Sequence, residues 1–288
     1  GTFNEPMDNW LSFFMFTYFT DRDGKFQLKS FAESAFDPLA RTCRFMLTEE
    51  AHHMFVGETG VGRVIERTCA AMKAAGIEDP YDIAKIRALG VVDLPTLQKK
   101  ANLHFSLSLD LFGSEVSTNA ANFYHSGVKG RFMETRIEDD HELSRATYPV
   151  LKLINGELKL VDEPALTALN MRLRDDYVKD CQGGINRWNK IIEKLGINFR
   201  IALPSVAFHR HIGEFKDVKA SPDGRLLSDM EWIKGEAQWL PSKDDGDFIA
   251  SLMEPCWERG KYANWIAAPK IGIDNKDGDF EYVRIARG

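Results

Sequence analysis

The sequence predicts a mainly α-helical bundle over residues 1–196, followed by an irregular, partly β region over residues 197–288. Three observations support this prediction. Apolar residues recur at three- and four-residue spacing over long stretches of the first region, which is typical of amphipathic helices. Beyond residue 197 this spacing fades, while Pro, Gly and Trp become frequent. No internal repeat interrupts either region.

The first two helices are expected to form a hairpin. Aromatic residues crowd the first half of a helix over residues 8–34, and Asp8 is a suitable N-cap. A short turn leads to Pro38, which can occupy the first position of a second helix over residues 38–75. Gly76 is a typical C-terminal stop for that helix.

Four further elements are expected along the chain. Apolar spacing predicts one long helix over about residues 95–125. Asn155-Gly156 lies between two short apolar runs, which indicates a β-hairpin. Pro164 is expected to open a helix of about 30 residues, and the alternation over residues 199–208 predicts a strand.

Composition limits the class of protein. The 288 residues carry a formal net charge of −6, which argues against a nucleic-acid-binding role. No apolar run reaches the roughly 18 residues needed to cross a membrane, so no membrane partner is expected. The four cysteines are widely scattered, with no Cys-x-x-Cys pair, which favours free thiols in the reducing cytoplasm. They are Cys43, Cys69, Cys181 and Cys256.

Glu50 and His53 form a Glu-x-x-His pair within the second predicted helix. Residues three apart lie on one helical face, so both side chains can reach the same metal ion. Asp21 precedes the hairpin turn by about 14 residues and Glu50 follows it by about 14, so the two should lie at the same height. A carboxylate opposite a Glu-x-x-His pair is half of the ligand set of ferritin-like di-iron proteins. The absence of thiolates favours iron or manganese.

The spacing leaves a second register open. Glu49 and His52 are also three residues apart, on a face that is nearly as apolar. Their alternative role is to orient the metal ligands through hydrogen bonds.

A second Glu-x-x-His pair occurs at Glu138 and His141, with Asp110 or Glu115 upstream. The helical neighbours of Glu138 are all polar, so a solvated segment is the better interpretation. The chain is therefore expected to carry only half of a di-iron site.

Several long motifs together resemble one known family, and they span essentially the whole chain. They are residues 13–25, 34–38, 44–55, 108–115, 117–122, 129–131, 188–190, 207–210, 265–267 and 280–284. The family is the oxygenase component of benzoyl-coenzyme A 2,3-epoxidase.

The resemblance implies a ferritin-like di-iron monooxygenase of aerobic benzoate breakdown. Such an enzyme inserts one oxygen atom of O2 into the ring of benzoyl-CoA, using electrons that a separate flavin/iron–sulfur reductase takes from NADPH. The family's C-terminal metal ligands match Asp21, Glu50 and His53, and its other three ligands lie in an N-terminal half. The chain resembles only the C-terminal part. A start at Gly1, without Met and close to a ligand helix, is expected for a cut through a larger helical domain.

Candidate substrate contacts extend this prediction. Apolar residues around Asp21, such as Phe14 and Tyr18, either line a pocket for the aromatic ring or belong to the core. Cationic residues are expected where the phosphates of coenzyme A bind. The candidate substrate-binding residues are Asn4, Thr17, Ser117, Asn122, Lys129 and Arg131.

Two other functions fit the same residues. One is a non-catalytic ferritin-like protein that stores metal, in which two half-sites meet across a dimer axis. The other is an acyl-CoA-binding helical protein that has lost its metal chemistry.

Overall fold

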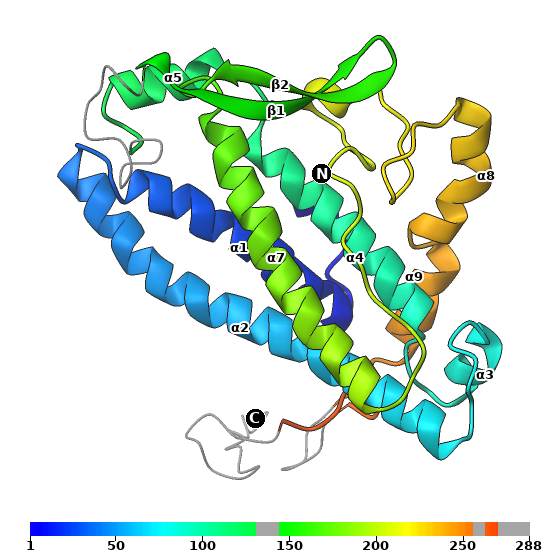
Figure 1. Cartoon of the computed structure of the whole chain (residues 1–288). Coiled ribbons are helices and arrows are strands. Elements are labelled where there is room, and N and C mark those ends of the chain that lie inside the picture. Colours follow the sequence, from blue (N-terminus) through cyan, green and yellow to red (C-terminus); the bar gives the residue numbers. More distant parts are fainter. Residues whose placement is uncertain (131–143, 256–262, 270–288) are drawn as a thin grey trace.

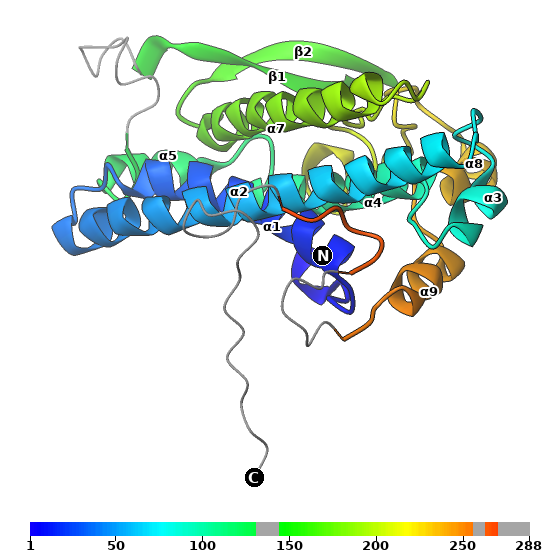
Figure 2. The same cartoon turned by 90° about the horizontal axis from the view of Figure 1, so that it is seen from below.

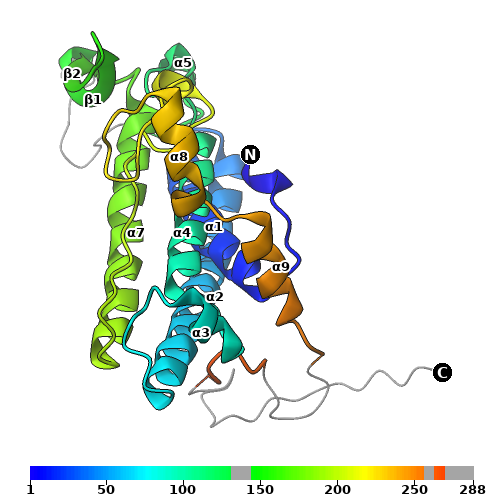
Figure 3. The same cartoon turned by 90° about the vertical axis from the view of Figure 1, so that its right-hand side faces the viewer.

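Four long helices run side by side through the computed structural model, which describes residues 1–130, 144–255 and 263–269 (Figure 1). They are α1 (Trp10–Phe31), α2 (Asp37–Ala74), α4 (Leu94–Leu109) and α7 (Leu169–Lys194). Figures 1 and 3 show α1 and α4 running in one direction and α2 and α7 in the other. The predicted mainly α fold is therefore confirmed, and its assignment as ferritin-like stays a prediction.

Short elements surround these helices. They are η1 (Thr2–Asn4), α3 (Ile83–Ala88), η2 (Asp110–Phe112), α5 (Thr118–His125), η3 (Gly213–Phe215), α8 (Asp229–Trp239) and α9 (Lys243–Ser251). A single antiparallel sheet, β1 (Thr147–Ile154) with β2 (Glu157–Pro164), lies over the α5 end of the bundle (Figures 1 and 2). None of the helices within the described ranges is long and apolar enough to cross a membrane.

Helix α1 is central to the core because it packs on α2, α4 and α7. Its apolar side chains join those of the other three helices in one large buried cluster. Tyr18 extends this contact, since its hydroxyl donates a 2.7 Å hydrogen bond to the carbonyl oxygen of Cys181 in α7. Two small residues of α2, Gly57 and Gly60, let α1 approach closely. A Cβ atom at Gly57 would overlap the backbone nitrogen of Tyr18, and one at Gly60 would overlap the ring of Phe14.

The ends of the α1–α2 hairpin differ in detail from the prediction. Asn9, rather than Asp8, caps α1, because its side-chain oxygen accepts a 2.8 Å hydrogen bond from the backbone N–H of Ser12. Pro38 lies in the first turn of α2, one position later than predicted, because the helix begins at Asp37 with Phe36 as its N-cap. Gly76 follows the helix with a φ of +67°, which matches the predicted stop.

The single helix predicted over residues 95–125 is wrong. Helix α4 ends at Leu109, and Gly113, with a φ of +85°, redirects the chain before α5 begins. The helix expected to open at Pro164 begins later, at Leu169, since Pro164 ends β2 and pairs with Thr147.

The strand predicted over residues 199–208 is absent from the described part of the chain. Residues 199–205 are irregular and 206–209 form turns, in which Ala207 and Phe208 are buried. Phe208 donates its backbone N–H to the carbonyl oxygen of Ser205, and the Asn189 side chain exchanges two 2.8 Å hydrogen bonds with the backbone of Ile201. Backbone groups are thus satisfied without a partner strand.

The predicted β-hairpin is confirmed. Asn155 and Gly156 have φ angles of +51° and +80° and connect Ile154 to Glu157, which pair across the turn. Cysteines are as expected in the described residues: Cys43, Cys69 and Cys181 are buried free thiols. Cys256 lies outside the described residues.

Candidate metal centre

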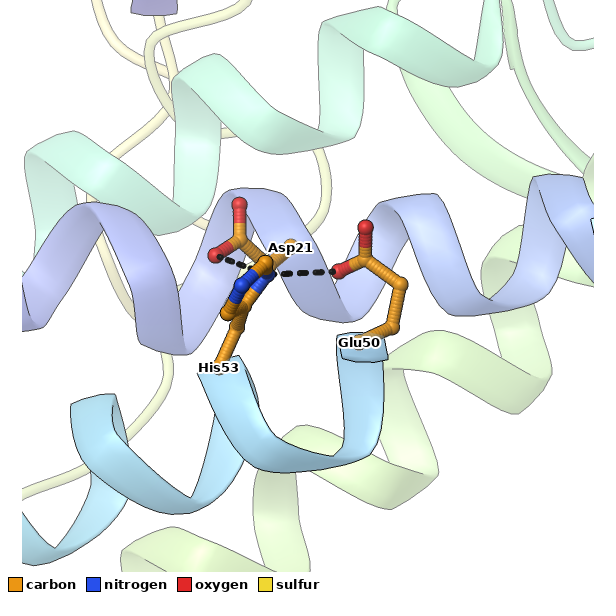
Figure 4. Close-up of side chains that lie close together, drawn as sticks. All are labelled: Asp21, Glu50 and His53. Carbon is orange, nitrogen blue, oxygen red and sulfur yellow. Dashed lines mark ion pairs between the residues drawn. The ribbon is translucent and has the colours of Figure 1, made fainter. Parts of the chain in front are cut away.

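Asp21 of α1 and Glu50 and His53 of α2 converge on one point (Figure 4). One ligand atom from each residue lies within 4.8 Å of the other two. The Nδ1 atom of His53 is 3.7 Å from Oδ2 of Asp21 and 3.8 Å from Oε2 of Glu50. The equal distances of Asp21 and Glu50 from the hairpin turn, used to predict this pairing, thus bring the side chains together.

Close packing of the two helices sets this geometry. Gly24 lies one turn after Asp21, and a Cβ atom there would lie 3.8 Å from the carboxylate of Glu50. Glu50 therefore reaches over the surface of α1 at a point where α1 carries no side chain. A Cβ atom at position 24 would touch this carboxylate at an ordinary van der Waals distance.

The electrostatics of the three residues are those of a cation site. Burial, followed by the nearby Glu50 carboxylate, raises the pKa of Asp21 to about 6, against the lowering effect of His53. Burial likewise raises the pKa of Glu50, again opposed by His53. Burial disfavours the charged forms of both carboxyl groups, Glu50 adds to this cost at Asp21, and a bound cation would remove the cost.

Glu50 supplies a direct test of whether a metal fits. Its Oε2 atom is buried and has no hydrogen-bond partner. Buried carboxylate oxygens are normally hydrogen-bonded, so this atom, whose nearest ionic partner is His53 at 3.8 Å, is available to a bound cation. Two carboxylates and one imidazole, with no thiolate, form a donor set that suits iron or manganese. The residues present therefore fit a metal ion.

The metal centre opens into a cavity of about 500 Å³. Its walls come from the N-terminal segment, from one face of α1 and from the three metal-centre residues. The lining residues are Thr2, Phe3, Glu5, Met7, Phe13, Phe16, Thr17, Asp21, Glu50 and His53. This wall is mostly apolar, so the cavity can take an apolar molecule beside the metal ligands.

The alternative register does not lie at the cavity. Glu49 and His52 are both exposed and have no hydrogen-bond partner among the residues that the structure describes. Glu49 acts on the centre only through its charge, which contributes to the raised pKa of Glu50. The geometry thus favours the Glu50–His53 register.

The predicted substrate contacts are spread over the fold. Thr17 lines the cavity, where its hydroxyl donates to the carbonyl oxygen of Phe13 at 3.1 Å. Asn4 lies next to lining residues in η1 but does not line the cavity itself. Phe14 and Tyr18, the alternative pocket residues, belong to the buried core.

Three other candidates lie away from the cavity. Ser117 precedes α5, and Asn122 lies on its exposed surface. Lys129 is buried, with its Nζ atom 3.3 Å from Oδ1 of Asn170 and over the ring of Phe31. Burial lowers the pKa of Lys129. The substrate roles of these residues stay predictions.

The structure describes only part of the second ligand set that the sequence offered. Glu138 and His141, together with the candidate Arg131, lie outside the described residues. Asp110 and Glu115 are described, and they form ion pairs with buried arginines instead of facing the metal centre.

Sequence reasoning missed most of the cavity wall. Phe3, Glu5 and Met7 precede the first helix, and no spacing rule places an irregular segment against a helix face. Gly24 was noted only as a weak point of the helix. The position of Gly24, one helical turn after Asp21, was the signal in the sequence that could have indicated the contact with Glu50.

The chain is 58% identical over 282 residues to benzoyl-CoA oxygenase component B of Aromatoleum evansii. The match covers 98% of this chain and 59% of that protein, so the chain spans about three fifths of the relative's length. No family model matches the chain. The resemblance inferred from the sequence motifs is therefore confirmed along nearly the whole chain.

Proposed function

We propose that this chain is part of a di-iron monooxygenase that acts on benzoyl-CoA. The observation that carries the proposal is the convergence of Asp21, Glu50 and His53 at an apolar cavity. The 58% identity to a protein named benzoyl-CoA oxygenase component B supports the substrate assignment. The reaction we assign is epoxidation of the aromatic ring with one oxygen atom of O2.

The three metal-centre residues bind one iron ion from two neighbouring helices. Both carboxylates are held by close helix packing, and the buried Oε2 atom of Glu50 is available to the ion. A bound di-iron centre supplies the activation of O2 that side chains alone do not provide. Phe3, Phe13 and Phe16 keep the cavity apolar, which favours an aromatic ring and disfavours water.

The second iron needs ligands from outside the described residues, since Asp21, Glu50 and His53 are the one group of this kind found within them. The match leaves about two fifths of the relative uncovered, and we assign these ligands to that remainder, which the family resemblance places in the N-terminal half. One face of α2 is suited to receive that half. It carries the exposed residues Phe45 and Phe55 on either side of Glu49 and His52.

The name of the relative marks it as one component among several. We assign the missing reductant to a flavin/iron–sulfur reductase that uses NADPH. We place the system in the cytoplasm, because Cys43, Cys69 and Cys181 are free thiols.

Oxygen consumption tests this proposal. The intact oxygenase, loaded with iron, is mixed with NADPH, the reductase and benzoyl-CoA, and the thioester product is analysed by mass spectrometry. We expect uptake that depends on benzoyl-CoA and a product heavier by one oxygen atom. Glu50→Gln should lower the rate at least 100-fold, while the neighbouring Glu49→Gln should leave it within about twofold. Equal rates for Glu50→Gln and the wild type would contradict the assignment.

A further inference from the structure

A second cavity, of about 150 Å³, lies between the loop around η3 and helix α8, away from the metal centre. Its wall is rich in cationic and imidazole side chains and holds a single carboxylate. The lining residues are His209, Arg210, His211, Lys216, Val218, Lys219, Trp232 and Glu236. Three permanent cations thus face one exposed glutamate, in a protein whose net charge is −6.

Arg210 is fixed at the base of this cavity. It is 3% exposed, and its Nε atom donates a 2.6 Å hydrogen bond to Oδ1 of Asp110. Its Nη1 atom lies 3.3 Å from Oε1 of Glu115, whose other strong partner is Arg174 at 2.5 Å. The Nη2 atom of Arg210 is buried and has no partner. One guanidinium donor is therefore held rigidly and remains available to an acceptor.

The other cations are not neutralised by the protein. Within the described ranges, Lys216 and Lys219 form no ion pair, and Lys219 lies over the ring of Trp232 at 5.4 Å. His209 also lines the cavity, with its Nδ1 atom buried and without a partner. Burial, followed by the nearby His211, lowers the pKa of His209 to about 4, against the raising effect of Asp110.

Such a site suits a phosphate group. Phosphate oxygens accept hydrogen bonds from guanidinium and ammonium donors together, and these charge-assisted bonds are among the strongest in proteins. A phosphomonoester carries nearly two negative charges at neutral pH, which matches the surplus of cations. The small volume accommodates one phosphate group rather than a whole nucleotide.

Buried hydrogen bonds connect α1, which carries Asp21, to Arg210 across the end of α4. Thr20, the neighbour of Asp21, shares a 3.1 Å hydrogen bond with the hydroxyl of Ser108. Two residues later, Asp110 holds Arg210. An acyl-CoA is elongated, with its thioester at one end and its phosphates towards the other. Its reacting ring and its phosphates therefore need separate sites on the same protein.

We propose that this cavity binds the 3′-phosphate of the coenzyme A part of the substrate. The inference rests on the proposed function, because that function supplies the acyl-CoA. It assigns phosphate recognition to Arg210, Lys216 and Lys219, rather than to the buried Lys129.

The test compares benzoyl-CoA with benzoyl-dephospho-CoA, which lacks only the 3′-phosphate, by isothermal titration calorimetry on the intact protein. The test variant is Lys216→Ala/Lys219→Ala, and both lysines are exposed. The matched control is Lys190→Ala/Lys194→Ala, an exposed lysine pair on α7. We expect the wild type and the control to bind benzoyl-CoA at least about tenfold more tightly than the dephospho analogue. The test variant should lose this preference.

Each other outcome has a distinct meaning. If no protein binds either thioester, the proposed function itself fails. If the test variant keeps the wild-type preference, or the wild type shows none, the phosphate assignment is overturned while the proposed function stands. Inorganic phosphate is the third probe. If it binds the wild type but not the test variant, while thioester affinities do not differ, the cavity takes phosphate from another source and the CoA assignment is wrong.

Discussion

At the scale of single residues, the metal-centre carboxylates weaken the metal-free fold. Burial and Glu50 raise the pKa of Asp21 to about 6. A carboxyl group with a raised pKa binds a proton more tightly in the folded state than in the unfolded state. Its contribution to stability is therefore most favourable below pH 4 and falls as the pH rises through 6.

Replacing Asp21 by Asn should remove this cost. We expect Asp21→Asn to raise the unfolding free energy of metal-free protein at pH 7.5 by about 1–2 kcal/mol, after allowance for partial exposure. Urea unfolding of both proteins measures this difference in unfolding free energy. Added Fe(II) should stabilise the wild type and leave the variant nearly unaffected, because only the wild type has the full ligand set. A variant that is less stable than the metal-free wild type would show that Asp21 has a structural partner instead.

His104 gives an independent pH prediction. It is 1% exposed in α4, and burial, followed by the charge of Lys100, lowers its pKa to about 3. The unfolded state takes up a proton near pH 6.5, so the stability contributed by neutral His104 is lost as the pH falls below that value. Between pH 7.5 and 4.5 the wild type should lose about 2–3 kcal/mol more than His104→Leu, measured by urea unfolding. Equal losses would mean that His104 can be protonated in the folded protein.

The site residues themselves were predictable because their signals are local. A three-residue spacing and the distance from one turn pointed to Asp21, Glu50 and His53, although the spacing also left the Glu49–His52 register open. The phosphate cavity was not predictable in this way, since Asp110, Glu115 and Arg210 pair across about 100 residues of sequence. The spacing of residues along one helix does not indicate contacts between residues that lie so far apart in the sequence.

At the scale of elements, the close crossing of α1 and α2 holds the metal ligands in place. A Cβ atom at Gly57 would lie 2.6 Å from the hydroxyl oxygen of Thr17 and overlap the backbone of α1. Gly57→Ala should therefore separate the helices and lower the unfolding free energy by about 2 kcal/mol or more, despite a helix propensity gain of about 1 kcal/mol. Iron affinity should fall with it.

Gly183→Ala is the matched control for this prediction. A Cβ atom there meets only the flexible end of Arg187, at 3.6 Å, so the propensity gain should prevail. Thermal unfolding of both variants distinguishes the two cases. A Gly57→Ala protein as stable as Gly183→Ala would show that the helix crossing adjusts without cost.

Element positions were largely predictable and their ends were not. Helical periodicity located α1, α2 and α7, and the Asn155-Gly156 turn located the hairpin. The failures have physical causes: Gly113 breaks a continuous apolar pattern, and residues 199–208 form irregular backbone and turns with no partner strand in the described part of the chain. The spacing of apolar residues in the sequence indicates which side chains are buried. Whether such a segment forms a strand or a turn depends on which groups its backbone hydrogen-bonds to, and the spacing does not show this.

At the scale of the whole molecule, one face of α2 exposes two phenylalanines on either side of Glu49 and His52. Phe45 is 72% exposed and Phe55 is 64% exposed, beside the metal centre. Exposed apolar patches of this kind mark interaction sites. We propose that this face receives the part of the oxygenase that supplies the other metal ligands.

The isolated 288-residue chain should consequently self-associate. Sedimentation at rising concentration should show oligomers, and Phe45→Gln/Phe55→Gln should reduce them strongly. Met230→Gln/Ile233→Gln, which removes two exposed apolar residues from α8, should have little effect. Equal effects of the two variants would show that the α2 face is not special.

The most direct test of the account is equilibrium Fe(II) binding by the intact protein under anaerobic conditions. His53→Ala and His52→Ala change neighbouring histidines of the same helix, of which only His53 reaches Asp21 and Glu50. We predict that His53→Ala lowers iron affinity at least about tenfold, while His52→Ala binds iron as the wild type does. Unchanged iron binding by His53→Ala, or its loss in His52→Ala, would contradict the metal centre described here.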